Sequence, residues 1–108
     1  MKKIQILGLG EWVVDILGEQ KFSGGAPANF AQFTQGLGYA TGLVSAIGKD
    51  ELGTFLLNQI KERNINTDFV QVKKVQTGTV QVVLNGTEPE FTVSEKAAWD
   101  TIEWSKDL

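Results

Sequence analysis

The chain has 108 residues, the size of one domain, and its 42% hydrophobic and 21% charged residues are typical of soluble globular proteins. A formal net charge of −3, with no run of Lys or Arg, argues against nucleic-acid and anionic-membrane partners. Because Cys and His are both absent, disulfides and thiolate nucleophiles are excluded, the commonest zinc ligands are missing, and a cytoplasmic location is expected.

The first third of the chain predicts two short strands and a helix. Residues 3–9 form an Ile- and Leu-rich run typical of a buried strand, too short for a signal segment or a membrane span. Residues 13–17 form a second apolar run, and a polar turn is expected over residues 18–21. A helix is expected to begin near Pro27 and to end at Gly36.

The rest of the chain predicts a further strand and helix, followed by a small β-meander. A β-type run covers residues 43–47, and Asp50 is a natural N-cap for a helix over residues 51–63. Strand candidates follow at residues 69–72 and 79–84, and Asn85-Gly86 is a strong turn signal before a returning strand. The order predicts an α/β fold in one domain.

Two local patterns allow a structural interpretation beside a functional one. Gly8 and Gly10 form a G-x-G after a strand, but Val13 stands where a dinucleotide fingerprint needs its third glycine, so a bend in the strand is favoured over a Rossmann site. The stretch "GKDELG", residues 48–53, is explained as a strand end, an N-cap and a first helical turn.

Asp15 and the stretch "SGGAPANFAQF", residues 23–33, leave alternatives open. Asp15 lies among apolar residues and is either exposed on an edge strand or an acceptor for two polyol hydroxyls. Gly24 and Gly25 form either a tight turn or a bare backbone that a ligand ring can approach. Asn29 is either part of a helix start or a donor and acceptor for a vicinal diol. No phosphate-binding G-x-x-x-x-G-K-[ST] motif is present.

Taken together, these segments resemble the ribokinase-like (PfkB-type) carbohydrate kinases over essentially all 108 residues. The similar segments are "GEWVVD" (10–15), "GGAPANFA" (24–31) and "VSAIGKDELG" (44–53). "TGTVQVVL" (77–84), "PEFTV" (89–93) and "AWD" (98–100) resemble the fructokinase-type branch in particular, although Val14 and the pair Lys96-Ala97 depart from that branch.

The resemblance implies a fold, a ligand and partners. The implied fold is part of a three-layer α/β sandwich, residues 1–66 and 94–108, with a small β lid over residues 67–93. Asp15, Gly24, Gly25 and Asn29 align with the sugar-binding positions of the family. Fructose or a similar sugar is the implied ligand, and a homodimer or a complementing C-terminal half is the implied partner.

The family's Gly-Ala-Gly-Asp loop, which supplies the catalytic Asp, is absent from this sequence. We therefore expect no catalytic residue and no metal site here, with ATP and Mg²⁺ used only by a complete enzyme of the family. The expected function is the N-terminal sugar-binding and lid portion of a fructokinase-like kinase, inactive alone. The alternative is a non-catalytic interaction or dimerisation module derived from such a kinase.

Overall fold

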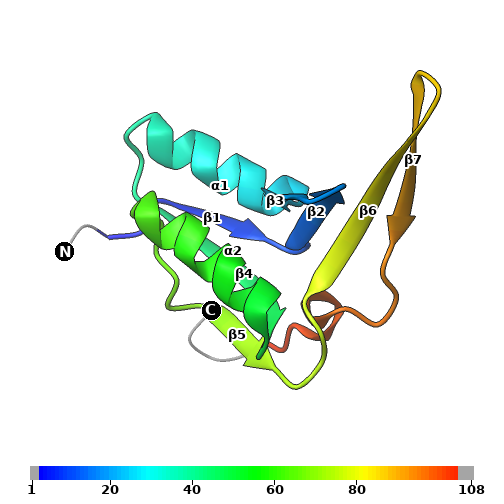
Figure 1. Cartoon of the computed structure of the whole chain (residues 1–108). Helices are drawn as coiled ribbons and strands as arrows, with labels where there is room; N and C mark the ends of the chain where they lie inside the picture. Colours follow the sequence, from blue (N-terminus) through cyan, green and yellow to red (C-terminus); the bar gives the residue numbers. More distant parts are fainter. Residues whose placement is uncertain (1–2, 105–108) are drawn as a thin grey trace.

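The computed structural model describes residues 3–104 and contains two β-sheets, two α-helices and one 3₁₀ turn (Figure 1). The first sheet is parallel and has the order β1 (Ile6–Leu9), β4 (Thr41–Gly48), β5 (Val70–Lys73). Every residue of the central strand β4 is buried. This arrangement confirms the predicted α/β fold, and β1 begins three residues later than the sequence predicted.

The helices α1 (Ala26–Gly36) and α2 (Glu51–Glu62) begin and end close to the predicted positions. Pro27 lies in the first turn of α1, and Asp50 is the N-cap of α2. Within residues 3–104, neither helix is long and apolar enough to cross a membrane.

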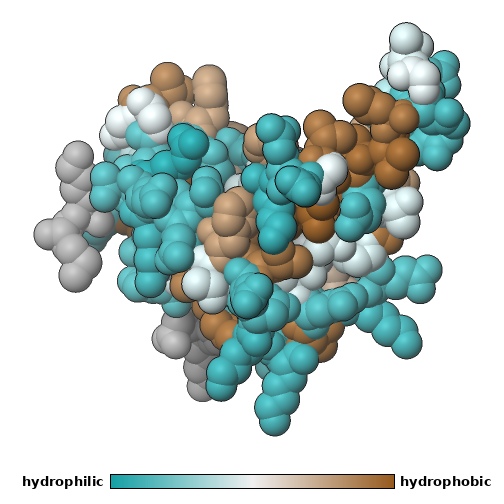
Figure 2. Space-filling model, in the orientation of Figure 1, coloured by the Kyte–Doolittle hydropathy of each residue, from teal (hydrophilic) through white to brown (hydrophobic). Residues whose placement is uncertain are grey.

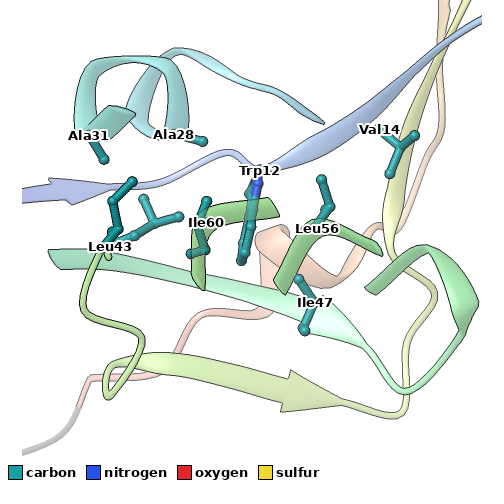
Figure 3. Close-up of a cluster of buried hydrophobic side chains, with 9 residues drawn as sticks. Trp12, Val14, Ala28, Ala31, Leu43, Ile47, Leu56 and Ile60 are labelled. Carbon is teal, nitrogen blue, oxygen red and sulfur yellow. The ribbon is translucent and has the colours of Figure 1, made fainter. Parts of the chain in front are cut away.

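The two helices pack on the same face of the parallel sheet and enclose the hydrophobic core (Figure 3). Alternate residues of β4, Leu43 and Ile47, point into this core, and the Trp12 side chain lies between Leu56 and Ile60 of α2. The Trp12 indole N–H donates to the Ser23 hydroxyl at 3.1 Å, so its polar atom is satisfied. The opposite face of the sheet is partly covered by the 3₁₀ turn η1 (Ala98–Thr101) and the residues after it.

The second sheet has the order β3 (Gln20–Gly24), β2 (Val13–Leu17), β6 (Gly78–Asn85), β7 (Glu88–Val93). Strand β2 pairs antiparallel with β3 and parallel with β6, while β6 and β7 form a hairpin that projects from the body of the molecule (Figure 1). The hairpin turns at residues 86–87, where Gly86 adopts φ +71°, in agreement with the predicted Asn85-Gly86 turn.

Two sequence predictions about this region are wrong. The sequence predicts that the strand at residues 69–72 belongs to the lid over residues 67–93, but β5 pairs with β4 in the first sheet, because a strand after α2 completes a parallel β-α-β unit. The polar turn expected at residues 18–21 is confined to Gly18 and Glu19, and Gln20–Gly24 is strand β3. Polar residues on an edge strand hide the usual apolar pattern of a strand.

Candidate functional site

Asp15 is the third residue of β2 and lies in the middle of the second sheet. Its neighbours in register are Phe22 of β3 and Val80 of β6. Side chains alternate along a strand, so Asp15 shares a face with Val13, whereas Val14 points into the core on the other face. Asp15 is therefore a half-buried carboxylate on the face of β2 that is turned away from the core.

Gly24 lies against the Asp15 carboxylate, and Gly25 lies against the backbone of Glu11 and Trp12. A Cβ atom added at Gly24 would lie 2.6 Å from Asp15 Cγ and 2.7 Å from Asp15 Oδ1. A Cβ added at Gly25, which has φ +98°, would lie 2.5 Å from the Glu11 carbonyl oxygen. The space beside each glycine is thus filled by protein atoms, and the missing side chain at Gly24 makes room for the Asp15 carboxylate.

Helix α1 begins directly after this contact. Its N-cap is Gly25, which offers no side chain to accept hydrogen bonds from the first N–H groups of the helix, and its first turn contains no acidic residue. Asn29 donates its backbone N–H to the Gly25 carbonyl at 3.0 Å, and its side chain is exposed. The first N–H groups of α1 and the Asn29 carboxamide therefore lie within about one helical turn of Gly24 and Gly25.

The Asp15 carboxylate has no hydrogen-bond donor among the described residues. Burial raises the pKa of the Asp15 carboxyl, because a charge removed from water without a partner favours the protonated form. An unpaired, half-buried carboxylate has two oxygens that can each accept a hydroxyl group. Such a carboxylate is suited to a ligand that carries hydroxyl groups on neighbouring carbon atoms.

The structure brings three of the four predicted residues together. Asp15 contacts Gly24, and Gly25 follows directly. Asn29 lies on the same helix start, but within residues 3–104 it forms no hydrogen bond with Asp15. Their roles as sugar ligands remain predictions.

Trp99, within the "AWD" segment, is a further candidate for the site. A Cβ added at Gly78 would lie 3.0 Å from both Trp99 Cδ1 and Val13 Cγ1, so the Trp99 ring lies on the Asp15 face of the sheet. Its indole N–H is buried and has no partner among residues 3–104. No pattern in the sequence placed this ring on the Asp15 face of β2, because its position beside Gly78 and Val13 depends on the parallel pairing of β2 with β6.

Asp50 follows the end of β4 and connects β4, the first turn of α2 and the residue before β6. Its carboxylate accepts from the Gly53 N–H at 2.8 Å, from the Thr77 hydroxyl at 2.6 Å and from the Thr77 N–H at 3.0 Å. The Thr77 hydroxyl oxygen in turn accepts from the Gly48 N–H at 2.8 Å. The capping role predicted for "GKDELG" is confirmed, and the same carboxylate also holds the residue that precedes β6.

The pKa of Asp50 reflects these contacts. Desolvation by burial pushes the pKa upward, but the hydrogen bonds from the Thr77 hydroxyl, the Thr77 N–H and the Gly53 N–H outweigh it, so the net pKa is lowered. Asp50 is therefore an ionised structural group, in contrast to the unpartnered Asp15.

Two surface cavities lie away from these residues. One of 430 Å³ is lined mainly by polar residues, among them Gln35, Asn64 and Asn66, near the beginning of β4. Another of 420 Å³ is lined mainly by apolar residues, among them Leu7 and Leu9 of β1. Neither cavity includes any of the four predicted site residues.

Among the described residues there is no group of three or more Asp, Glu, His or Cys side chains that could hold a metal ion.

Comparison with protein families shows a match between residues 13–106 and the pfkB family carbohydrate kinase. Among curated proteins, a sugar kinase from Pyrococcus horikoshii is 30% identical and is matched over 94% of this chain and 40% of its own length. An ATP-dependent 6-phosphofructokinase from Thermoanaerobacterium thermosaccharolyticum is 31% identical, over 99% of this chain and 36% of its own length. The chain thus spans about two fifths or less of the length of these relatives.

Solved structures give the same result. The fructokinase from Xylella fastidiosa with bound ATP superposes with a TM-score of 0.82 and 32% identity over 87% of this chain and 31% of its own. The crystal structure of the Pyrococcus horikoshii sugar kinase superposes with a TM-score of 0.80 over 92% of this chain and 40% of its own.

Proposed function

Since this chain belongs to the pfkB family of carbohydrate kinases, we propose that it is the sugar-binding portion of an ATP-dependent, fructokinase-like sugar kinase. The observation that carries the proposal is the Asp15 carboxylate, which lies against Gly24 at the entrance to α1 and has no donor of its own among the described residues. A half-buried carboxylate without a hydrogen-bond partner lowers the stability of the folded state. A ligand with hydroxyl groups would supply the missing donors.

The groups around Asp15 suit a polyol. Two carboxylate oxygens accept hydroxyl hydrogens, while Asn29 and the uncapped N–H groups of α1 can donate to hydroxyl oxygens. Trp99 and Val80 supply apolar surface on the same face of the sheet, against which the C–H groups of a sugar ring can pack. In this proposal the second sheet acts as the cover of the site, and fructose or a similar sugar is the ligand.

ATP and Mg²⁺ do not fit the residues of this chain. The sequence contains neither a phosphate-binding glycine-lysine loop nor the Gly-Ala-Gly-Asp loop of the family, and residues 3–104 hold no acidic cluster for a metal. We therefore assign nucleotide binding and phosphoryl transfer to the part of the kinase that this chain does not match, and we expect the isolated chain to be inactive.

A titration of the isolated chain with fructose, ribose and adenosine tests the proposal. We expect fructose at millimolar concentration to shift the backbone NMR signals of Asp15, Gly24 and Asn29, because these groups would contact the hydroxyls. Adenosine is the matched control and should leave them unchanged. If no sugar shifts these signals, the proposed function is wrong. Release of ADP from Mg-ATP and fructose by the purified chain would contradict the expected inactivity.

One observation favours the alternative, a non-catalytic association module. Apolar side chains on the second sheet are more than half exposed, and Figure 2 shows hydrophobic surface over β6 and β7. They are Phe22, Leu84, Phe91 and Val93. A surface of this kind is typical of association sites. Light scattering across a concentration series separates the two functions, since a chain that stays monomeric would contradict the association module.

A further inference from the structure

Phe22 is the one large apolar side chain of the edge strand β3. The other residues of this strand are Gln20, Lys21, Ser23 and Gly24. Phe22 is 51% exposed and does not belong to the hydrophobic core cluster. An exposed aromatic ring alone indicates nothing about function, so the position of this ring relative to Asp15 is the informative observation.

The orientation of β3 is fixed by Ser23. This residue is in register with Val14, which points into the core, and its hydroxyl accepts from the Trp12 indole N–H at 3.1 Å. The Ser23 side chain therefore points to the core side of the second sheet. Because side chains alternate along a strand, Phe22 points to the opposite face, which is the face of Asp15.

Phe22 and Asp15 are direct cross-strand neighbours. They are paired in register between β3 and β2, and Val80 of β6 is paired with Asp15 on its other side. The Cβ atoms of such pairs lie about 4.5–5.5 Å apart, which is within reach of an aromatic side chain. The Asp15 carboxylate lies against Gly24, where no side chain covers it. A molecule that binds this carboxylate is thus placed beside the Phe22 ring.

The carboxylate and the aromatic ring recognise different parts of a ligand. The carboxylate accepts from hydroxyl groups, which a cyclic sugar and an open-chain polyol both carry. The ring packs against apolar surface, and the C–H groups on one side of a closed sugar ring form a surface of this kind. An open-chain polyol has to lose the rotation about its C–C bonds before it can present such a surface, and that ordering weakens its binding.

We infer that Phe22 is a specificity-determining residue of the sugar site, and that its ring selects a cyclic sugar over an open-chain polyol. This inference rests on the proposed function. Asp15 accepts the hydroxyls of either ligand, whereas Phe22 contacts the C–H face that only the closed ring presents. Val80, the neighbour of Asp15 on the other side, has no aromatic face, so the selection depends on β3.

Titrations with fructose, which is largely cyclic in water, and with the open-chain polyol mannitol test this inference, with the NMR signals of Asp15 and Gly24 as the readout. We expect the unaltered chain to bind fructose at least fivefold more tightly than mannitol. Phe22→Ala should lower the fructose affinity about fivefold and leave the mannitol affinity within about twofold, so that the preference disappears. Phe22→Tyr keeps the aromatic face and should retain the preference.

Phe33→Ala is the matched control. Phe33 is 67% exposed and lies on α1, about 12 Å along the helix from its N-cap Gly25, so its removal should leave both affinities unchanged. Circular dichroism of Phe22→Ala checks that the chain remains folded, which its exposed position leads us to expect.

Three outcomes would overturn the inference. They are a fructose affinity that Phe22→Ala leaves unchanged, an equal loss of affinity for fructose and mannitol, and an unaltered chain that does not prefer fructose. If Phe22→Ala abolishes a dimer seen by light scattering and leaves fructose binding unchanged, Phe22 belongs to an association surface instead. If neither compound shifts the Asp15 signals of the unaltered chain, the proposed function fails together with the inference. A normal response to fructose that Phe22→Ala does not alter overturns only the role of Phe22, so the two failures are distinguishable.

Discussion

Asp15→Asn is expected to weaken fructose binding to the isolated chain by at least tenfold. The substitution keeps the shape of the side chain, but it replaces one acceptor oxygen by an NH₂ group, which is a donor, and it removes the negative charge. Hydrogen bonds to a charged acceptor contribute about 1.5–3 kcal/mol, which corresponds to roughly a tenfold to hundredfold change in affinity. Isothermal titration calorimetry measures the change. Asp100→Asn is the matched control, because Asp100 is an exposed residue of η1, and it should bind as the unaltered chain does.

The same substitution should raise the stability of the free protein. Burial raises the pKa of Asp15, so the folded state favours the neutral form and is destabilised when the carboxyl is ionised. The free energy of unfolding of Asp15→Asn should therefore exceed that of the unaltered chain at neutral pH. The difference should shrink as the pH falls through the raised folded-state pKa and should vanish below the ordinary value of 3.8, where Asp15 is protonated in both the folded and the unfolded state. Lower stability of Asp15→Asn at neutral pH would show that Asp15 has a structural partner.

Asp50→Ala is expected to lower the free energy of unfolding by about 2 kcal/mol, because it removes the N-cap of α2 and both hydrogen bonds from Thr77. Thermal unfolding should shift down by about 10 °C. The lowered pKa means that the contribution of Asp50 is present above 3.8 and is lost as the pH falls through the lowered folded-state pKa. Chemical denaturation at pH 7 and at pH 3 measures this dependence.

Thr77→Val is the matched variant for Asp50. It removes the hydroxyl that donates to Asp50 and accepts from Gly48 but leaves the cap of α2 intact, so a loss of about 1 kcal/mol is expected. Both variants should accelerate amide exchange at Thr77 more than at Leu56 in the core. Equal acceleration at the two positions would show that Asp50 acts only on global stability and does not hold the beginning of β6.

The local predictions that succeeded depend on neighbouring residues. Pro27 and Gly36 bound α1, Asp50 caps α2, and Asn85-Gly86 marks the β6–β7 hairpin. Each of these signals comes from the backbone preference or the hydrogen bonding of one or two residues, and a sequence displays such features directly.

The predictions that failed concern pairing between distant segments. A short apolar run at residues 69–72 fits either sheet, and only the position of β4 decides that β5 joins the first. The polar residues Gln20 and Lys21 concealed β3, and with it the register that places Gly24 beside Asp15. The sequence therefore pointed to Asp15 and Gly24 separately as candidate site residues. It did not predict the contact between the Asp15 carboxylate and Gly24, which explains why a glycine occupies that position.

The pKa of the Asp15 carboxyl, measured by ¹³C NMR with and without saturating fructose, tests the central claim most directly. If sugar hydroxyls donate to this carboxylate, they stabilise its ionised form, and the pKa should fall when fructose is added. The pKa of Asp50, which already has donors, should stay unchanged and serves as the internal reference. A pKa of Asp15 that is the same with and without bound fructose would contradict the claim that Asp15 holds the sugar.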